Sequence, residues 1–526
     1  MEPESLNNLH LAPSSEDLAL LRALPGVREA AFVLCESHTS GEEFLVAYIV
    51  PDDDYITRVL AGEDHERNRI QKWRKTFDLS QFGKQAEHSE PGFNIAGWNS
   101  SYTRQPIPPE HMREWVDLTV QELLCFSPRE ILEIGCGTGL LLLRMAPACE
   151  RYVGTDFAAA VLKKLKNQID EINGAGSNVT LHERSADNFD GFGENSFDTV
   201  ILNSVVKYFP GPSYLLKVLQ GALRVTKPGG RIFVGDVRNF ALLEPYAASI
   251  ELYQAPPAMS LGELRDRVHH RVRFEDQLVI SPAFFLALRE LFPKITRVEV
   301  HPKPGRFDNE MTRFRFNAIL HLETEKESPL EFSFLDYLEQ RFTLDSVSDL
   351  LQNKNTKSLA IKNIINARIE NDLVAFSRLA VAEASATVSE FKTSLEQRAL
   401  QGIDPQNLWA LGEQLGYRAD ISWASSRTDG SYDAVFRKLR ASHELSHTAM
   451  AWPQNPIDAK NLAHYANTPG RAVLREKLIE QLLEFSQKNI PQNSAPGSFF
   501  LVDALPLTAD GKVDVHKLPA PPTPHS

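Results

Sequence analysis

One segment of the chain is more informative than any other, and it reads Ile131-Leu132-Glu133-Ile134-Gly135-Cys136-Gly137-Thr138-Gly139. Its first four residues form an apolar run that is typical of a buried parallel strand, and residues 140–145 predict the start of a helix. The glycines between them allow a tight turn and a close approach of the backbone to a ligand. A dinucleotide fingerprint would need its third glycine at position 140, where the chain has Leu140. The segment therefore predicts a strand, a ligand-binding loop and a helix, but not a dinucleotide site.

The acidic residue in this segment narrows the choice of ligand. Glu133 lies one residue before the end of the predicted strand, where its carboxylate suits a cationic group, such as an amino-acid ammonium, better than a pyrophosphate. The E-x-G-x-G-x-G pattern resembles the first motif of class I S-adenosylmethionine (SAM) methyltransferases. That resemblance implies SAM as the cofactor and an α/β fold with a Rossmann-like doubly wound sheet. The cofactor contacts that it implies in the loop are Glu133, Gly135, Cys136, Gly137 and Gly139.

The composition of the 526 residues is that of an ordinary globular protein with two or three domains. A net charge of −13 argues against a general nucleic-acid binder, and no apolar run reaches membrane-spanning length. The N-terminus lacks a basic region followed by an apolar core, so we expect no secretory signal and a cytoplasmic protein. Four cysteines without a C-x-x-C pair indicate a reducing compartment and no metal site.

Helix and strand signals alternate along the middle of the chain as in a doubly wound α/β domain. We expect its strands at residues 131–134, 152–156, 179–183, 197–203, 231–236, 296–302 and 314–322. Residues 332–400 show apolar positions at helical spacing, and residues 418–437 predict short strands around a Thr-Asp-Gly turn.

The two ends of the chain predict a smaller α+β piece. The expected elements are a helix at 15–24, strands at 29–35 and 44–50, a helix after 471 and a strand at 498–503. The Pro-rich tail that follows is expected to be loose.

The ends of the second and third strands should complete the cofactor site. Asp156 follows the second strand about 20 residues after the glycine loop, where a carboxylate can accept from both ribose hydroxyls, and Phe157 can flank the adenine. Asp187, with Asn188 beside it, follows the third strand and can accept from the adenine amino group. Taken singly, Asp156 could be a helix cap and Asp187 a solvated loop acid. Their order and spacing together favour the cofactor site.

The fourth and fifth strands also end in polar residues, at the edge of the sheet where open α/β folds bind ligands. Asn203 and Ser204 end the fourth strand, and Asp236 follows the fifth. The segment from Val225 to Val234 resembles the L-K-P-G-G-x-L motif of the same methyltransferase superfamily.

Several further segments resemble the methyltransferase domains embedded in nonribosomal peptide synthetases. They are Gly97 to Thr103, Asn203 to Pro210, Gly235 to Arg238, Glu251 to Pro256 and Asn309 to Phe316. In that family the domain interrupts the small C-terminal subdomain of an amino-acid adenylation domain. The flanks here resemble the two halves of such a subdomain, with Leu21 to Ala30 and Leu45 to Pro51 in the first half and Phe499 to Pro519 in the last.

The resemblance implies four consecutive segments. Residues 1–85 are the first part of the adenylation-type subdomain with a linker, 86–325 the methyltransferase core, 326–462 a helical and short-strand extension, and 463–526 the second part of the subdomain. The large adenylation core has no counterpart, because His38 to Gly41 is too short for its phosphate-binding loop and lacks the lysine. Lys512 matches the family's adenylation lysine, but Asp510 and Val515-His516 depart from the pattern. The chain is thus either an excised synthetase segment or a free-standing methyltransferase scaffolded by the subdomain halves.

Methyl transfer from a sulfonium is an in-line displacement, so the enzyme mainly positions donor and acceptor. An attacking α-amine, with a pKa of about 8, loses its proton without a strong base. The expected catalytic residues are therefore hydrogen-bond acceptors that aim the nitrogen, namely Asn203, Asp236 and Glu310, with Asn203 also a cofactor contact. Arg313 is a fourth candidate, since Arg313 and Arg315 alternate on one face of the last strand, unless they pair with surface acids.

Tyr102 is expected to cap the cofactor or to close the substrate channel. The favoured function is N-methylation of an aminoacyl thioester on the phosphopantetheine arm of a peptidyl carrier protein. An adenylation core or other synthetase domains would be further partners, and no nucleic acid or membrane is expected. The alternatives are O- or C-methylation of a tethered or free small molecule, and a non-catalytic docking module.

Overall fold

The computed structural model describes residues 7–11, 16–36, 43–52, 55, 63–79, 92–171, 178–324, 329–353, 356–396, 400–439, 449–491, 495–502, 504–508 and 511–518. The chain divides into two compact units, one made of Met1–Arg67 and Thr468–Ser526 and the other of Asn68–Asn467. The sequence-based statements on His38 to Gly41, on Asp510 and on residues 519–526 lie outside the described residues.

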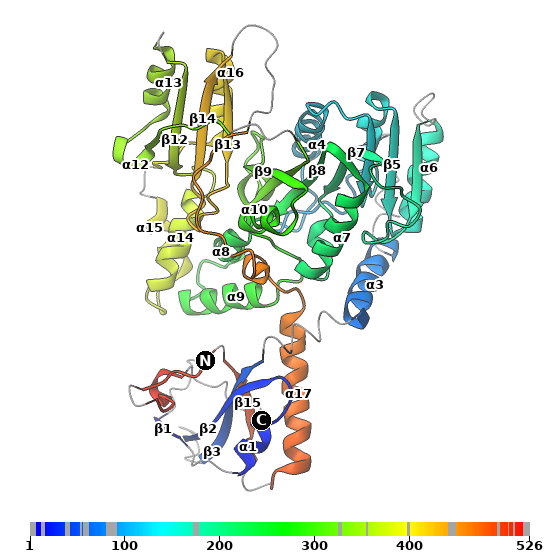
Figure 1. Ribbon diagram of the computed structural model, residues 1–526. Coiled ribbons are helices and arrows are strands. Elements are labelled where there is room, and N and C mark those ends of the chain that lie inside the picture. Colours follow the sequence, from blue (N-terminus) through cyan, green and yellow to red (C-terminus); the bar gives the residue numbers. More distant parts are fainter. Residues whose placement is uncertain are drawn as a thin grey trace. The chain divides into compact units, whose positions relative to one another are not determined.

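The first unit is a four-stranded sheet built from both ends of the chain (Figure 1). Its strands are β1 (Asn7–Leu11), β2 (Val27–Glu36), β3 (Glu43–Pro51) and β15 (Ser498–Leu501), in that order. The strand β15 joins the edge of β3 in parallel, with Phe499 opposite Ala47. The helices α1 (Glu16–Arg22) and α17 (Arg471–Asn489) bury Leu21 and Leu482 in a core that also contains Phe499. The helices and strands predicted for the two ends of the chain are confirmed.

The second unit contains a seven-stranded sheet with the order β6-β5-β4-β7-β8-β10-β9. These strands are β4 (Glu130–Ile134), β5 (Arg151–Asp156), β6 (Val179–Glu183), β7 (Phe197–Asn203), β8 (Thr226–Arg238), β9 (Ile295–Pro302) and β10 (Arg315–Leu322). The strand β10 runs antiparallel to β8 and β9, and the other six strands all run in one direction. The predicted doubly wound α/β fold and its seven strands are confirmed, although β8 begins five residues earlier than expected.

Helices cover both faces of this sheet because successive strand residues point to opposite sides. On one face, Ile131, Ile201 and Phe233 pack with α4 (Pro109–Leu124), α5 (Leu142–Met145) and α6 (Ala159–Glu171). On the other, Leu132, Val200 and Ile232 pack with α7 (Pro212–Val225) and α10 (Pro282–Leu291). The strand ends are thereby fixed from two sides, which positions the loops that follow them.

An extension of the second unit adds another four-stranded sheet, with the order β11-β12-β14-β13. Its strands are β11 (Phe334–Asp336), β12 (Ser358–Ile364), β13 (Tyr417–Ser422) and β14 (Tyr432–Lys438). Its helices are α12 (Tyr337–Gln340), α13 (Leu344–Gln352), α14 (Glu370–Val381), α15 (Val388–Glu396) and α16 (Pro405–Leu415). The prediction of a helical pattern over residues 332–400 is wrong at the short strand β11 and at β12. The β12 segment is apolar enough to fit either pattern, and pairing with β14 settles it as a strand.

The extension is tied to the core around the seven-stranded sheet by shared packing. Ala375 and Leu379 on α14 lie in one apolar cluster with Ala247 and Ala248 on α8 (Leu243–Gln254). That cluster also includes Leu264 on α9 (Leu261–Arg273). The extension thus supports the two helices that follow β8, which form one wall of the cavity described below.

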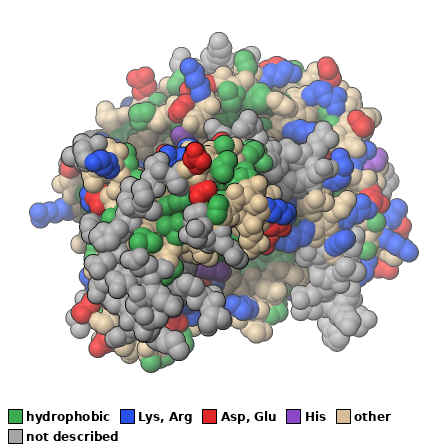
Figure 2. Space-filling model, turned by 90° about the horizontal axis from the view of Figure 1, so that it is seen from below, with side chains coloured by type: hydrophobic (Ala, Val, Ile, Leu, Met, Phe, Trp, Pro, Cys, Tyr) green, Lys and Arg blue, Asp and Glu red, His purple; other side chains and the backbone are tan. Residues whose placement is uncertain are grey.

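In the part of the chain that the structure describes, no helix is both long and apolar enough to cross a membrane. On the face seen in Figure 2, the visible basic and acidic side chains are interspersed rather than separated into regions of one sign. The acidic side chains visible on this face are therefore not concentrated in one region.

Candidate active site

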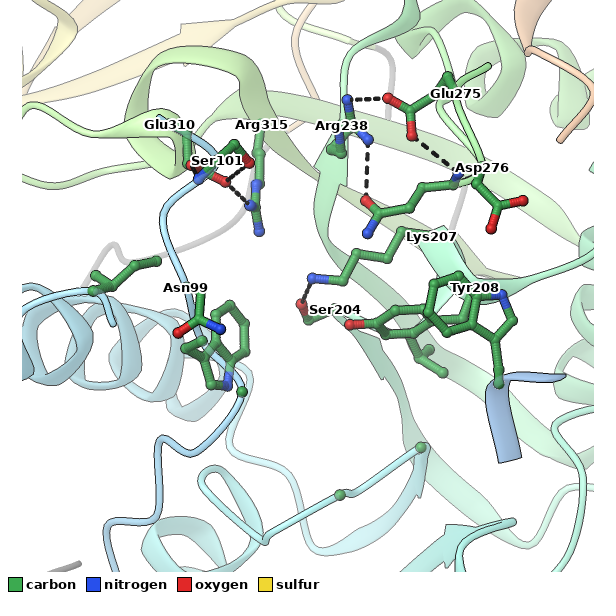
Figure 3. A pocket seen from close by; sticks show the side chains of 18 of the residues that line it. Asn99, Ser101, Ser204, Lys207, Tyr208, Arg238, Glu275, Asp276, Glu310 and Arg315 are labelled. Carbon is green, nitrogen blue, oxygen red and sulfur yellow. Dashed lines mark hydrogen bonds and ion pairs between the residues drawn. The ribbon is translucent and has the colours of Figure 1, made fainter. Parts of the chain in front are cut away.

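A cavity of about 930 Å³ lies at the carboxyl ends of the parallel strands of the second unit. Its volume is near the upper end of the range typical of small-molecule sites, roughly 300–1,000 Å³. One end is lined by the glycine loop after β4 and by Asp156 and Phe157 after β5. The other end is lined by Glu310, Arg315 and residues of α8 and α9 (Figure 3). A single cavity therefore joins the loop predicted to bind a ligand to a second, polar end.

The glycines of the loop have two different tasks. Gly135, Gly137 and Gly139 all have positive φ angles, of 76°, 51° and 81°. A Cβ on Gly135 would lie 2.5 Å from Val205 and one on Gly139 would lie 2.4 Å from Leu165, so these two allow the loop to pack. A Cβ on Gly137 would meet nothing within 4 Å, although Gly137 lines the cavity. Gly137 therefore leaves open a space that a ligand can fill.

Glu133 is a buried acid in the wall of the cavity beside the glycine loop. Its side chain accepts a hydrogen bond from the Tyr152 hydroxyl at 2.8 Å and is only 3 % exposed. Burial raises the pKa of Glu133 to about 8, and the nearby Asp156 adds to this effect. A ligand that brings a positive charge would favour the ionised form of Glu133. Cys136 lines the cavity beside it as a buried thiol whose pKa is raised, chiefly by burial.

Asp156 and Asn203 complete the predicted cofactor end. The Asp156 carboxylate accepts from the backbone N–H of Gly137 at 3.0 Å and of Ala158 at 2.9 Å, which fixes it at the edge of the cavity. Asn203 also lines the cavity, and its buried Oδ1 has no hydrogen-bond partner among the described residues. A buried acceptor without a partner is costly unless a ligand supplies the donor. The structure thus brings together Glu133, the glycine loop, Asp156, Phe157 and Asn203.

Asp187 and Asn188 are not brought to the cavity, contrary to the sequence-based prediction. The Asp187 carboxylate accepts from the Tyr214 hydroxyl at 2.8 Å and from Lys217 Nζ at 2.6 Å. The Asn188 side chain accepts from the backbone N–H of Asp190. A smaller cavity next to Asp156 and Phe157 is lined instead by Arg184, Ser185 and Ala186. The third-strand loop therefore borders the site through the residues that precede Asp187.

The other end of the cavity is organised by Arg315. Its guanidinium donates to Asp236 at 2.7 Å and to Glu310 at 2.9 Å, so one cation holds two acids. Glu310 lines the cavity and also accepts from the backbone N–H and the hydroxyl of Ser101, at 2.7 and 3.0 Å. Burial disfavours the charged form of Arg315, but the two carboxylates outweigh burial and raise its pKa above the ordinary value. Glu310 and Arg315 thus form a fixed, buried ion pair that faces the cavity.

Asp236 lies behind this pair and is not on the cavity wall, which corrects its predicted direct role. It accepts from Trp115 Nε1 at 3.0 Å and from the Ser204 hydroxyl at 2.8 Å, and its side chain is fully buried. Burial opposes its ionisation, but Arg315 and other cations outweigh burial and lower its pKa to about 2. Asp236 therefore positions Arg315 and Ser204 rather than touching a ligand.

The backbone at the two strand ends is strained. Ser204 after β7 and Asp236 in β8 have φ angles of 57° and 62°, in the left-handed region that non-glycine residues seldom adopt. The backbone N–H of Asp236 is satisfied by Asn317 Oδ1 at 3.0 Å. Strain of this kind persists where surrounding contacts impose it and is concentrated at functional sites.

Arg313 and Tyr102 form an outer layer rather than lining the cavity. Glu310–Phe314 is a short helix, α11, so Arg313 does not share a strand face with Arg315 as predicted. Arg313 instead forms an ion pair with Asp372 of α14 and donates to the carbonyl of Arg368. The Tyr102 hydroxyl bonds Ser249 at 2.8 Å, and its ring lies beneath the Arg313 guanidinium. These residues connect the core to the extension.

Replacing Arg313 by alanine is expected to affect stability more than catalysis. The Asp372 carboxylate, 12 % exposed, would lose its cation, so we expect the free energy of unfolding to fall by about 1–3 kcal/mol. Turnover by the folded variant should stay within about threefold of the wild type. Urea unfolding and steady-state kinetics would check this, with D372N as the partner variant. A large loss of turnover at unchanged stability would restore Arg313 to the catalytic group.

Sequence reasoning gave no role to Lys207, which the structure places inside the cavity. Its ammonium donates to the Ser204 hydroxyl at 3.0 Å and lies over the rings of Trp98 and Tyr208 (Figure 3). Burial, aided by Arg315, lowers the pKa of Lys207 to about 7. The available signal was its position in the segment from Asn203 to Pro210, but its burial depends on residues far away in the chain.

The doubly wound sheet, with a cavity at the carboxyl ends of its parallel strands, is the arrangement expected of a class I SAM-dependent methyltransferase. Residues 132–232 match the family model of a methyltransferase domain. Among solved structures, the methyltransferase domain of bacterial CtHen1 is 17% identical, with a TM-score of 0.29, covering 40% of this chain and 99% of that one. The N-methyltransferase NodS of Bradyrhizobium japonicum with S-adenosyl-l-homocysteine is 14% identical, with a TM-score of 0.26, covering 43% and 100%.

Curated relatives add the context of nonribosomal peptide synthesis. The chondramide synthase of Chondromyces crocatus is 38% identical over 95% of this chain. The cyclosporin synthetase of Tolypocladium inflatum is 28% identical over 94%, and the enniatin synthase of Fusarium equiseti 27% identical over 90%. The chain spans only 13%, 3% and 16% of the length of these relatives. Residues 132–232 of this protein therefore match a methyltransferase domain, and nearly the whole chain is similar to a segment of nonribosomal peptide synthetases.

Proposed function

We propose that this protein N-methylates the α-amine of an aminoacyl group held as a thioester on the phosphopantetheine arm of a peptidyl carrier protein. The observation that carries the proposal is the single cavity, which links the glycine loop to a polar end lined by Glu310, Arg315 and Lys207. The similarity to peptide synthetases over 95% of the chain supports a tethered aminoacyl acceptor.

The residues at the glycine loop fit SAM, whose chemical contribution is an electrophilic methyl group on a sulfonium. Glu133 would hold the ammonium of its amino-acid end, and the unpaired Asn203 Oδ1 offers a further acceptor for that group. Gly137 leaves room for the ligand beside the loop, and Asp156 can accept from the ribose hydroxyls. Phe157, which lines both cavities at this end, can flank the adenine.

The residues at the polar end fit an amine acceptor. A neutral amine keeps two N–H donors and one lone pair, so hydrogen-bond acceptors on the wall can aim the lone pair toward the donor. Glu310 provides carboxylate oxygens whose position is fixed by Ser101 and Arg315. Asn99 and Ser101 line the same region and offer neutral polar groups. Such a wall binds a small polar amine without needing a metal or a strong base.

The proposal includes the origin of the flanking segments. We propose that residues 1–85 and 463–526 are the two parts of an adenylation-type C-terminal subdomain, interrupted by the core at 86–325 and the extension at 326–462. The union of Met1–Arg67 with Thr468–Ser526 in one compact unit supports this interruption. The strand β15 completes the sheet begun by β3, as expected if an insertion separates two halves of one domain.

The test is methylation of an aminoacyl-loaded carrier protein by the full chain with SAM. The expected result is an increase of about 14 Da on the aminoacyl arm, with fragmentation placing the methyl on the α-nitrogen. E310Q, which keeps the shape of the side chain, should reduce the rate while SAM binding by calorimetry is retained. A methyl located on oxygen or carbon would contradict N-methylation. SAM binding without any product would contradict the tethered aminoacyl acceptor, and no SAM binding would favour a docking module.

A further inference from the structure

Lys207 is held in the cavity with a geometry that leaves its nitrogen lone pair available when the amine is neutral. The Ser204 hydroxyl donates its hydrogen to Asp236 Oδ2 at 2.8 Å, so toward Lys207 it can act only as an acceptor. One N–H of Lys207 donates to Ser204 Oγ at 3.0 Å. This bond fixes the Nζ at the cavity wall, and Figure 3 shows the lysine side chain reaching into the space opposite Glu310.

The acids nearest to Lys207, Asp236 and Glu310, are both held by the same arginine. Asp236 receives bonds from Arg315, Trp115 and Ser204, and Glu310 receives bonds from Arg315 and Ser101. For Asp236, the surrounding cations outweigh burial and lower its pKa to about 2, so this carboxylate is a weak base. Proton transfer to either acid would also leave Arg315 without part of its counter-charge.

Burial is the main reason why the neutral form of Lys207 is accessible, and the charges that face it from neighbouring elements act in both directions. Arg315 on β10 and Arg238 on β8 oppose a third cation, whereas Asp236 and Glu310 favour it. Arg238 is itself balanced by Glu275 at 2.8 Å. Burial adds to the two arginines, and together they lower the pKa of Lys207 to about 7. His270, which also lines the cavity, stacks on Phe274 of the next turn.

We propose that neutral Lys207 is the general base that removes a proton from the ammonium group of the methyl acceptor. This inference rests on the proposed function, since it needs an amine acceptor. The acceptor R–NH₃⁺ gives one proton to Lys207 Nζ, which becomes –NH₃⁺, and the resulting R–NH₂ attacks the methyl carbon. The C–N bond forms as the S–C bond breaks with its electron pair left on sulfur. Lys207 then releases the proton to water at the mouth of the cavity.

The first test is the pH profile of turnover at saturating SAM and loaded carrier. Wild-type turnover should rise through a pKa near 7 and level off. K207M should be slower by about 10- to 100-fold at pH 7, and the gap should narrow above the acceptor's own pKa of about 8. K207R should also be slow at pH 7, because a guanidinium does not lose its proton in this range, and should recover only above the acceptor's own pKa. K166M, on the exposed face of α6, is the matched control and should follow the wild type.

The second test does not depend on activity. The Nζ of Lys207 can be titrated by NMR of lysine-labelled protein, with the signal assigned by its loss in K207M, and its midpoint should lie near 7. A midpoint near the ordinary lysine value of about 10.4 contradicts the inference, whatever the acceptor. Equal pH profiles for the wild type and K207M contradict it as well, and a shift in H270A alone would assign the base to His270. A wild type that leaves the loaded carrier unmethylated contradicts the proposed function instead.

Discussion

Replacing Arg315 by methionine is expected to lower the free energy of unfolding of the second unit by about 3–5 kcal/mol and to remove most of the activity. The guanidinium is 7 % exposed and is bonded to Asp236 and Glu310, whose side chains are 0 % and 5 % exposed. Methionine has a similar length but offers no donor, so two buried acids would lose their shared cation. Removing one partner of a buried pair costs far more than the intact pair contributes.

The pH dependence of this loss has a definite sign. The pKa of Asp236 is lowered to about 2 in the folded protein, so its ionised form adds stability at pH values above the ordinary aspartate pKa of about 3.9. That contribution disappears as the pH falls toward 2. The difference in stability between the wild type and R315M should therefore be complete at pH 7 and become smaller below pH 4.

Denaturant unfolding at pH 7 and pH 3 measures both effects, and two variants serve as controls. R306M removes an arginine side chain that is 85 % exposed and should change stability by less than about 0.5 kcal/mol. R315K keeps a cation that can reach one acid but lacks the two-sided geometry of guanidinium, so it should be intermediate. A stable R315M with normal turnover would show that the Asp236–Arg315–Glu310 arrangement does not support the site.

The predicted residues that the structure brings to the cavity are those whose positions are set by local pattern. The glycine loop follows β4 directly, Glu133 and Asp156 lie at the ends of β4 and β5, and in this sheet every parallel strand ends at the same edge. Their positions therefore follow from the strand periodicity alone. The strand β12 was missed because a short apolar run has no periodicity that separates helix from strand.

The remaining residues could not be placed because their partners are distant in sequence. Arg315 and Asp236 are 79 positions apart, and the pairing of β10 with β8 decides that they meet. Asp187 turns away from the cavity because Tyr214 and Lys217, on the following helix, satisfy its carboxylate. The lowered pKa of Lys207 likewise depends on burial and on Arg315. Motifs supply the residue types, and tertiary contacts decide which of them face a ligand.

Glu133 illustrates how a binding residue can reduce the stability of the ligand-free protein. Its pKa is about 8 in the folded protein, chiefly because of burial, against an ordinary value of about 4.3. Between these values the folded protein holds a proton that the unfolded chain has lost. The free energy of unfolding therefore falls as the pH rises through this interval, and by pH 7 the accumulated cost is about 3 kcal/mol.

Replacing Glu133 by glutamine is accordingly expected to stabilise the ligand-free protein and to weaken SAM binding. A glutamine side chain cannot ionise, but its carbonyl can still accept from Tyr152, so E133Q should be more stable than the wild type by about 3 kcal/mol at pH 7. This gain should nearly vanish near pH 4.5, because the carboxyl of Glu133 is then partly protonated in the unfolded wild type as well. Loss of the anion should weaken SAM binding by about 10- to 100-fold, as expected for a buried charge-assisted bond.

Calorimetry in buffers of different ionisation enthalpy gives this argument an independent measurement. If the cationic end of SAM stabilises ionised Glu133, wild-type binding at pH 7 should release nearly one proton, because the free protein carries that proton. E133Q should release almost none. D156N is the matched control: it removes a carboxylate from the same end of the cavity, so it should weaken binding but still release much of the proton, because burial contributes more than Asp156 to the raised pKa of Glu133. Equal proton release in the wild type and E133Q would show that Glu133 does not ionise on binding, and the ammonium would then have to be held by neutral acceptors such as Asn203 Oδ1.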